Sequence, residues 1–138
     1  MSFLLHELVA QYFSLKHPGL YKVGLEKDEK DIHCLKDTKY SIEIKASSDP
    51  KKIFANRSYA QPQTGKGQKS KDGYYITINF EKFKNAKNRT PKILLIRFGY
   101  LDHSDWIGQK AQTGQRAHLS ANVYKYKLNT IYDSTKTK

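Results

Sequence analysis

A glutamate and a lysine two positions apart have the clearest chemical potential in this chain. Glu43 and Lys45 lie in a run, residues 40–47, that alternates apolar and polar side chains. If the run is a strand, both charged groups lie on one face, because successive side chains of a strand point to opposite faces. A carboxylate there can hold a divalent cation, and the lysine can reach past it to an attacking water or a phosphate group. Such charged pairs also occur on ordinary solvated strands, so the surrounding residues decide the interpretation.

A second carboxylate close to Glu43 would complete a site for metal-assisted hydrolysis of a phosphodiester. In that reaction the metal polarises the phosphate and lowers the pKa of water, and Mg²⁺ takes one or two carboxylates besides water and phosphate oxygens. Asp31 is the candidate. If residues 30–35 pair antiparallel with 40–46 through a turn at 36–38, Asp31 lies directly opposite Glu43, and such partners are about 5 Å apart. A slip of one residue would turn Asp31 to the other face, so the site depends on this register.

The sequence therefore predicts a metal-dependent catalytic centre made of Asp31, Glu43 and Lys45. The expected Mg²⁺ ligands are Asp31, Glu43 and the backbone carbonyl of Ile44, with Mn²⁺ able to substitute for Mg²⁺. A solvated strand face that carries the same charged residues is the alternative that these residues alone leave open.

Two further residues could join this centre. Glu7 could reach the metal from an N-terminal helix as a third acidic group, although a helix glutamate is more often exposed to solvent. His33 shares the expected face of Asp31 and could be a base, or a hydrogen-bonded structural group.

The elements that must position these side chains follow from the apolar pattern. Residues 2–16 predict a helix with a broad apolar stripe, ended by His17-Pro18-Gly19. Three strands joined by charged turns predict an antiparallel meander. A later alternating run predicts another strand, and a continuous apolar run predicts one buried on both faces. These strands are expected at 20–25, 30–35, 40–46, 74–80 and 92–98. Residues 81–88 are expected to be a short helical or irregular link, and 118–132 either a strand pair or a helix.

Composition favours a nucleic acid as the partner. The chain has 138 residues, which suits a single domain over residues 1–138. Lys and Arg number 25 against 13 Asp and Glu, a net charge of +12, and a domain this basic usually binds a polyanion. A membrane surface is less favoured, since the lysines are spread along the chain without a basic amphipathic helix.

Other classes are disfavoured by what the sequence lacks. A lone cysteine, Cys34, cannot form an internal disulfide or a cysteine-based zinc site. No segment approaches the roughly 20 apolar residues that cross a bilayer, and the N-terminus lacks the charge and cleavage pattern of a signal peptide. We therefore expect a reducing, cytoplasmic location and no membrane partner.

Two polar segments, at about 47–72 and 100–116, are expected to be DNA-binding loops, and residues 134–138 a frayed tail. Lysines can contact phosphates, arginines can bind guanine bidentately, and asparagine and glutamine can do the same to adenine. Each position could also be an ordinary polar loop residue. The candidates are Lys66, Lys69 and Lys71 for phosphates, Arg57, Arg97 and Arg116 for guanine, Asn56, Gln61, Gln109, Gln112 and Gln115 for adenine, and Tyr59 as an aromatic contact.

Several longer stretches resemble a known group of nucleases. The chain is similar to PD-(D/E)xK nucleases and, more narrowly, to ScaI-like type II restriction endonucleases, from the first helix to near the C-terminus. Its Glu-x-Lys pattern is shared by many nucleases, whereas the stretches that contain Asn56 and Arg97 are far more specific. Lys30 precedes Asp31 where the named motif has proline. The resemblance is carried by residues 42–48, 56–61, 71–80, 96–109 and 113–117.

This resemblance implies a PD-(D/E)xK restriction-endonuclease-like core of the α/β class, with a mixed central sheet and an N-terminal helix packed on it. It also implies a magnesium-dependent endonuclease that cuts double-stranded DNA at a short palindrome, usually as a homodimer. Two alternatives remain open at this point. One is a structure-selective resolvase of Holliday junctions with the same fold, and the other is a nucleic-acid-binding module without catalysis.

Overall fold

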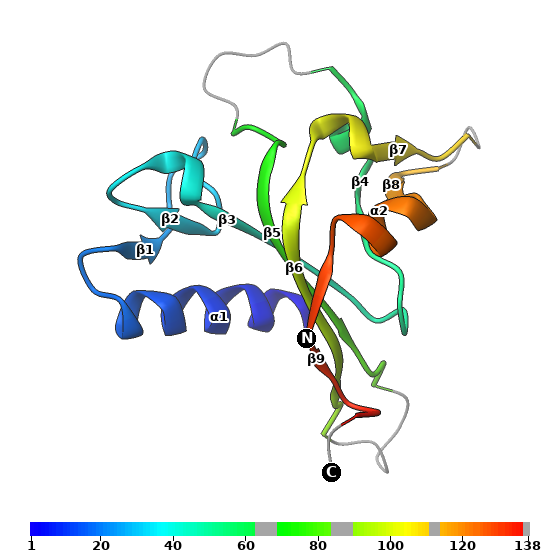
Figure 1. Ribbon diagram of the computed structural model, residues 1–138, viewed down its shortest axis with the longest axis horizontal. Coiled ribbons are helices and arrows are strands. Elements are labelled where there is room, and N and C mark those ends of the chain that lie inside the picture. The colour runs from blue at the N-terminus through cyan, green and yellow to red at the C-terminus, as the bar shows by residue number, and fades with distance from the viewer. Residues whose placement is uncertain (63–68, 84–89, 111–113, 137–138) are drawn as a thin grey trace.

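A computed structural model describes residues 1–62, 69–83, 90–110 and 114–136 (Figure 1). These residues form a mixed α/β structure with a six-stranded sheet, in the order β1-β2-β3-β5-β6-β9, and a three-stranded sheet, in the order β4-β8-β7. The strands are β1 (Tyr21–Val23), β2 (Ile32–Cys34), β3 (Ile42–Ser47), β4 (Phe54–Asn56), β5 (Gly73–Phe80), β6 (Ile93–Leu101), β7 (Trp106–Gly108), β8 (Arg116–Leu119) and β9 (Asn129–Asp133). The helices are α1 (Ser2–Lys16) and α2 (Ala121–Tyr126), with short 3-10 turns η1 (Thr38–Tyr40), η2 (Arg57–Ala60) and η3 (His103–Asp105).

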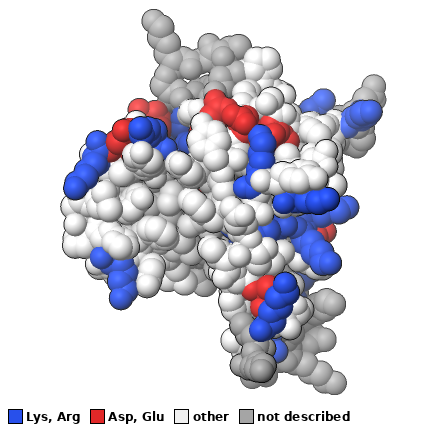
Figure 2. Space-filling model, viewed as in Figure 1, with Lys and Arg blue, Asp and Glu red and all other residues white. Residues whose placement is uncertain are grey.

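Helix α1 begins and ends where the sequence predicts, because an uninterrupted stretch rich in apolar residues forms it and Pro18 follows its last turn. Leu5, Val9, Ala10 and Phe13 pack against the six-stranded sheet. The predicted apolar stripe is wider than this buried face. Figure 2 shows a broad area without charged side chains on this side of the molecule, and the exposed apolar side chains of α1 are Phe3, Leu4, Leu8, Tyr12 and Leu15.

The first three strands form the predicted antiparallel meander in the predicted register. Ile32 pairs with Ile42, and this alignment places Asp31, one residue before β2, opposite Glu43. The connection between β2 and β3 differs from the predicted turn. It contains η1, capped by the side chain of Asp37, so β3 begins at Ile42 rather than at residue 40.

Strand β3 also pairs with β5, and this pairing is parallel. A parallel pair needs a long crossover between its strands, and here the crossover carries β4 and η2. The segment predicted as a polar loop at 47–72 is therefore partly structured, with Ile53, Ala55 and Tyr59 buried. The prediction missed β4 because three residues among polar neighbours show no clear alternation.

The predicted loop at 100–116 is likewise partly structured. Strand β6 continues to Leu101, η3 follows it, and Trp106 begins β7 as a buried side chain. Strand β8 pairs with both β4 and β7. The two polar segments of the sequence thus fold together into the three-stranded sheet.

The six-stranded sheet lies between two apolar layers (Figure 1). On one face α1 packs on side chains that include Ile44. On the other face, residues of the smaller sheet and α2 pack on side chains that include Tyr75. Because side chains alternate along β3, Glu43 and Lys45 lie on the face opposite to Ile44 and α1.

The C-terminal half departs from the sequence predictions in three ways. The start of β6, residues 93–96, is half-buried rather than buried on both faces. The stretch 118–132 contains both predicted alternatives, since α2 lies between β8 and β9. Residues 134–136 form a turn in which Ser134 donates to the carbonyl of Leu94, so this part is not frayed. Residues 137–138 and most of the link at 81–88 lie outside the described residues. Neither described helix is long and apolar enough to span a bilayer.

Candidate active site

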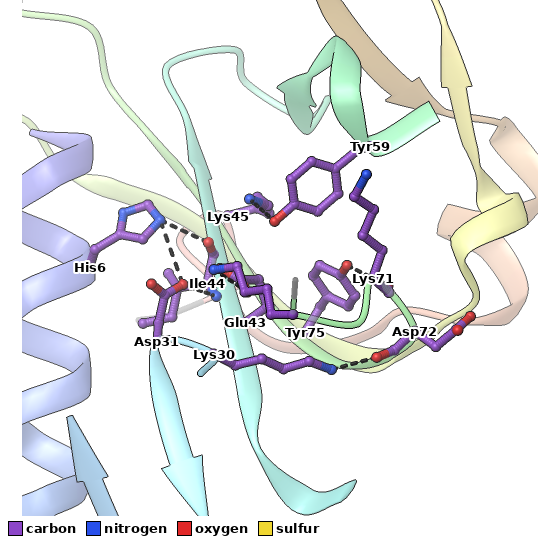
Figure 3. Close-up of polar contacts among 11 residues, drawn as sticks. His6, Lys30, Asp31, Glu43, Ile44, Lys45, Tyr59, Lys71, Asp72 and Tyr75 are labelled. Atoms are coloured by element: carbon purple, nitrogen blue, oxygen red, sulfur yellow. Dashed lines mark hydrogen bonds and ion pairs between the residues drawn. The ribbon is translucent and has the colours of Figure 1, made fainter. Parts of the chain in front are cut away.

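Asp31 and Glu43 meet at the edge between β2 and β3 (Figure 3). The Asp31 carboxylate accepts a hydrogen bond from the Ile44 N–H at 2.8 Å and is hydrogen-bonded to the carboxyl of Glu43. Glu43 is only 3% exposed. The structure therefore brings together the two carboxyl groups that the sequence pairs.

The two carboxyl groups have opposite pKa shifts. Burial and the neighbouring Asp31 raise the pKa of Glu43 to about 7. Burial would also raise the pKa of Asp31, but hydrogen bonds with Glu43 and the Ile44 amide hold it below its ordinary value. Two carboxyl groups this close do not both ionise readily, so the pair gives up its last proton only near neutral pH. A divalent cation between them would favour ionisation of both.

Lys45 lies beside this pair and is held by a tyrosine. Its Nζ donates to Tyr59 Oη at 2.9 Å and lies 4.0 Å from the centre of the ring. Tyr59 comes from η2 and packs edge-on against Trp106. Burial lowers the pKa of Lys45, and the charge of Glu43 opposes that shift. Lys45 is thus a partly desolvated cation, suited to stabilise negative charge on a phosphate group.

A second lysine contacts both oxygens of Glu43. Lys69 Nζ lies 3.0 Å from Oε1 and 2.9 Å from Oε2. The sequence predicts Lys69 as a phosphate contact, whereas here it lies on a carboxylate. Lys30 is buried nearby and donates to the carbonyl of Asp72. The carboxyl pair is therefore surrounded by lysines from three segments of the chain.

A histidine that the sequence analysis does not single out also borders the pair. His6 Nε2 donates to the carbonyl of Ile44 at 2.8 Å and lies 4.0 Å from Asp31 Oδ2. Glu7, the predicted acidic group from this helix, is instead exposed, because adjacent helix positions point about 100° apart. His33 lies with its Nδ1 3.3 Å from Glu29 Oε2, so its contact is with the preceding turn.

The donor set fits a hard divalent cation. Within the described residues, no three His, Cys, Asp or Glu side chains group closely enough to hold an ion by themselves. Two carboxyl groups and the carbonyl of Ile44 are nevertheless a suitable set for Mg²⁺, which keeps several waters and takes phosphate oxygens. The bond from His6 occupies one of the two lone pairs of that carbonyl. The raised pKa of Glu43 also indicates a place where added positive charge is favourable.

Several predicted base-reading residues come together at one end of the smaller sheet. Asn56 pairs with Arg116 across β4 and β8, and the Arg57 N–H donates to the carbonyl of Gln115. All four are exposed, and we call them the exposed polar cluster. The Gln109 N–H donates to the carbonyl of Arg116, which places Gln109 beside this cluster.

The other predicted DNA contacts have different surroundings. Gln61 is exposed directly after η2, and Lys71 donates to the carbonyl of Ser58. Tyr59 is buried, with its hydroxyl on Lys45 rather than at the surface. Lys66 and Gln112 lie outside the described residues.

Arg97 is placed in the interior, so the prediction that it binds guanine is not supported. It is 7% exposed, and its guanidinium donates to the carbonyl of Lys51 and to Asn79 Oδ1 at 3.0 Å. It also lies over the ring of Tyr124, 4.7 Å from the centroid. These contacts tie β6 to the crossover and α2, which is a structural role. Sequence alone could not separate it from the exposed arginines, because β6 reads as a strand without showing which neighbours cover it.

The fold and the site together define a mixed α/β protein that presents a carboxylate pair and a lysine from adjacent strands of its central sheet. The chain belongs to the ScaI restriction endonuclease family, whose model matches residues 1–132. It is 46% identical over 132 residues to the type II restriction enzyme ScaI of Streptomyces caespitosus. That alignment covers 96% of this chain and 58% of the relative, so the chain spans little more than half of the relative's length. No solved structure matches the chain. The resemblance to ScaI-like restriction endonucleases that the sequence shows is thereby confirmed.

Proposed function

We propose that this chain is a sequence-specific endonuclease of the type II restriction class, built on a PD-(D/E)xK core within one domain. It hydrolyses phosphodiester bonds of double-stranded DNA at a short palindrome with Mg²⁺, for which Mn²⁺ can substitute. The observation that carries this proposal is the meeting of Asp31 and Glu43 beside Lys45. Family membership and the net charge of +12 support DNA as the substrate.

Each residue of the site has a role in this reaction. Asp31, Glu43 and the Ile44 carbonyl would hold Mg²⁺, which when bound supplies charge to polarise the phosphate and acidify a water. Lys45 orients that water or stabilises the charge that develops on the phosphate. Tyr59 keeps the Lys45 ammonium beside the carboxyl pair. The ammonium group of Lys69, which lies on Glu43, would be free to bind a DNA phosphate if a cation took its place.

The exposed polar cluster, with Gln61 and Gln109 beside it, provides hydrogen-bonding groups for base edges. Lys71 lies between this cluster and the catalytic lysine, over the ring of Tyr59 at 5.4 Å, and contacts the phosphate backbone. Two copies of the chain, each cutting one strand, match the symmetry of a palindrome. We expect the enzyme to act in the cytoplasm, because its DNA substrate would be found there.

Incubation of the purified protein with DNA of known sequence tests the proposal. With Mg²⁺ or Mn²⁺, the wild type should give discrete fragments whose mapped ends share one short palindrome. Glu43→Ala and Lys45→Ala should bind the DNA but lose at least about a hundredfold in cleavage rate. Lys136→Ala, in the exposed turn after β9 and far along the chain from Asp31, Glu43 and Lys45, is the matched control and should cut normally.

Other outcomes would point to the alternatives. Intact DNA with a gel shift would indicate a binding module, and preferred cutting of four-way junctions would indicate a resolvase. Full activity of either site variant would show that the assigned residues are wrong. Sedimentation of the protein with and without DNA measures whether two copies assemble.

A further inference from the structure

The edge of β3 at Ile44 is completed by side chains rather than by a neighbouring strand. Strand β2 pairs with β3 only at Ile32 and Ile42. Two residues further along β3, the Ile44 N–H donates to Asp31 Oδ2 at 2.8 Å and the Ile44 carbonyl accepts from His6 Nε2 at 2.8 Å. The backbone between Glu43 and Lys45 is therefore held by one side chain from the meander and one from α1 (Figure 3).

Each ring nitrogen of His6 faces a backbone carbonyl, and the ring donates to both only when both nitrogens carry a proton. Its Nδ1 lies 2.8 Å from the carbonyl of Ser2, one helical turn back. Its Nε2, besides the bond to Ile44, lies 4.0 Å from Asp31 Oδ2. The ring is half-buried between α1 and the sheet edge. A ring held in this way presents its N–H in one direction, toward the Ile44 carbonyl and alongside the Asp31 carboxylate.

We propose that His6 is a positioning residue for the cation site, acting through the Ile44 carbonyl and Asp31. This inference rests on the proposed function and adds helix α1 to the machinery of the site. The N–H of His6 fixes the direction of the Ile44 carbonyl and leaves its second lone pair available to a cation. It also limits the rotation of the Asp31 side chain on its open side. Groups that orient metal ligands in this way change metal affinity or activity by about 10- to 100-fold when they are removed.

A purely structural bond at this position makes a different prediction. Among the residues that the structure describes, no strand pairs with the Ile44 carbonyl on this side, so a donor there would be needed for folding alone. Loss of the donor would then lower stability and leave the affinity for a cation unchanged in the folded protein. A positioning role requires that the affinity falls at temperatures where the variant is fully folded.

Three substitutions separate these roles. His6→Gln keeps an N–H donor of similar reach, His6→Phe keeps the ring without a donor, and Glu7→Ala changes the exposed neighbour. The measurements are Mn²⁺ affinity by electron paramagnetic resonance, the melting temperature, and kcat and KM of DNA cleavage. His6→Phe should bind Mn²⁺ roughly 10- to 100-fold more weakly and lose kcat by a similar factor with little change in KM. His6→Gln should stay within a few-fold of the wild type, and Glu7→Ala should match it.

Equal Mn²⁺ affinity of folded His6→Phe and wild type would overturn the inference. A His6→Gln variant as impaired as His6→Phe would also overturn it, because the donor would then not be what matters. The affinity measurement needs no cleavage. A wild type that binds Mn²⁺ but cuts no DNA would therefore reject the proposed function while still testing His6.

A variant-free measurement covers the case in which His6→Phe does not fold. Mg²⁺ titration of the wild type, followed by nuclear magnetic resonance, should shift the ring signals of His6. The signals of His33, which contacts Glu29 on the preceding turn, should stay in place. Shifts of both histidines, or of neither, would contradict the proposed role.

Discussion

At the residue scale, Glu43 combines three conditions that rarely occur together. It is buried, it is hydrogen-bonded to a second carboxyl group, and it touches a lysine. Burial and Asp31 favour its protonated form, and Lys69 favours its ionised form. As a result, the Glu43 carboxyl group changes charge near neutral pH, whereas the ordinary pKa of a glutamate is 4.5.

This shift predicts how stability depends on pH without added metal. Between pH 4.5 and about 7 the folded protein holds a proton on Glu43 that the unfolded chain has released, so the free energy of unfolding falls as pH rises through that range. Glu43→Gln removes the titration and should be more stable than the wild type at pH 8, by on the order of 3 kcal/mol. At pH 4 the two proteins should be nearly equal.

Urea unfolding of both proteins at pH 4, 6 and 8, in the presence of a chelator, measures the difference. A wild type that gains stability relative to Glu43→Gln as pH rises would contradict the assigned shift. Mg²⁺ at pH 8 should reduce the advantage of Glu43→Gln, because only the wild type keeps both carboxylates.

At the scale of elements, η2 links the exposed polar cluster to the catalytic strand. Asn56 caps η2, with its side chain accepting from the Ser58 N–H. Tyr59, at the third position of the same turn, accepts from Lys45. A movement of Asn56 or Arg57 on contact with bases would therefore shift Tyr59, and with it Lys45, through a short stretch of backbone.

Tyr59→Phe tests this link, since it removes the hydroxyl and keeps the ring against Trp106. We expect kcat to fall by roughly tenfold, because Lys45 loses its fixed position, with little change in DNA affinity. Tyr40→Phe, on the exposed turn η1, is the control and should be unaffected. Cleavage rates at saturating DNA, together with melting temperatures, measure both. Wild-type kcat in Tyr59→Phe would show that the hydrogen bond does not position Lys45.

The elements also show what a sequence can and cannot predict here. The helix at 2–16 and the pairing of Asp31 with Glu43 were predictable, because Pro18 and Gly19 end a long stretch rich in apolar residues and alternation fixes the strand register. Strand β4 was not, since three residues carry little pattern. The role of His6 depends on α1 approaching a strand 38 positions away, and the burial of Arg97 depends on the crossover that covers it. Local patterns contain no information on such contacts.

At the scale of the whole molecule, the crossover between β3 and β5 connects two central strands. It also contributes β4, which pairs with β8, to the smaller sheet. The face over α1 is apolar and the face over the crossover carries Asn56, Arg57 and Lys71. Under the proposed function, the DNA-contacting residues therefore lie on the side of the central sheet opposite α1, and α1 approaches the proposed cation site through His6 at the sheet edge. The carboxyl pair lies under that side, within reach of Lys69 from the end of the crossover.

The ammonium group of Lys69, which contacts both oxygens of Glu43, would compete with a divalent cation for this carboxylate. A divalent ion must displace the ammonium group, and a DNA phosphate gives the ammonium group another place to bind. The two ligands should thus be thermodynamically coupled, with DNA tightening Mn²⁺ binding by a factor in the range of about 5 to 150, and the ion tightening DNA binding by the same factor. Lys69→Ala should bind Mn²⁺ more tightly than the wild type in the absence of DNA, and its Mn²⁺ and DNA binding should be less strongly coupled. Lys71 contacts the Ser58 carbonyl instead of Glu43, so Lys71→Ala should keep the wild-type coupling between the two ligands. Mn²⁺ titrations with and without a duplex that carries an uncleavable linkage measure this coupling free energy, and equal affinities in the two titrations would rule out the exchange.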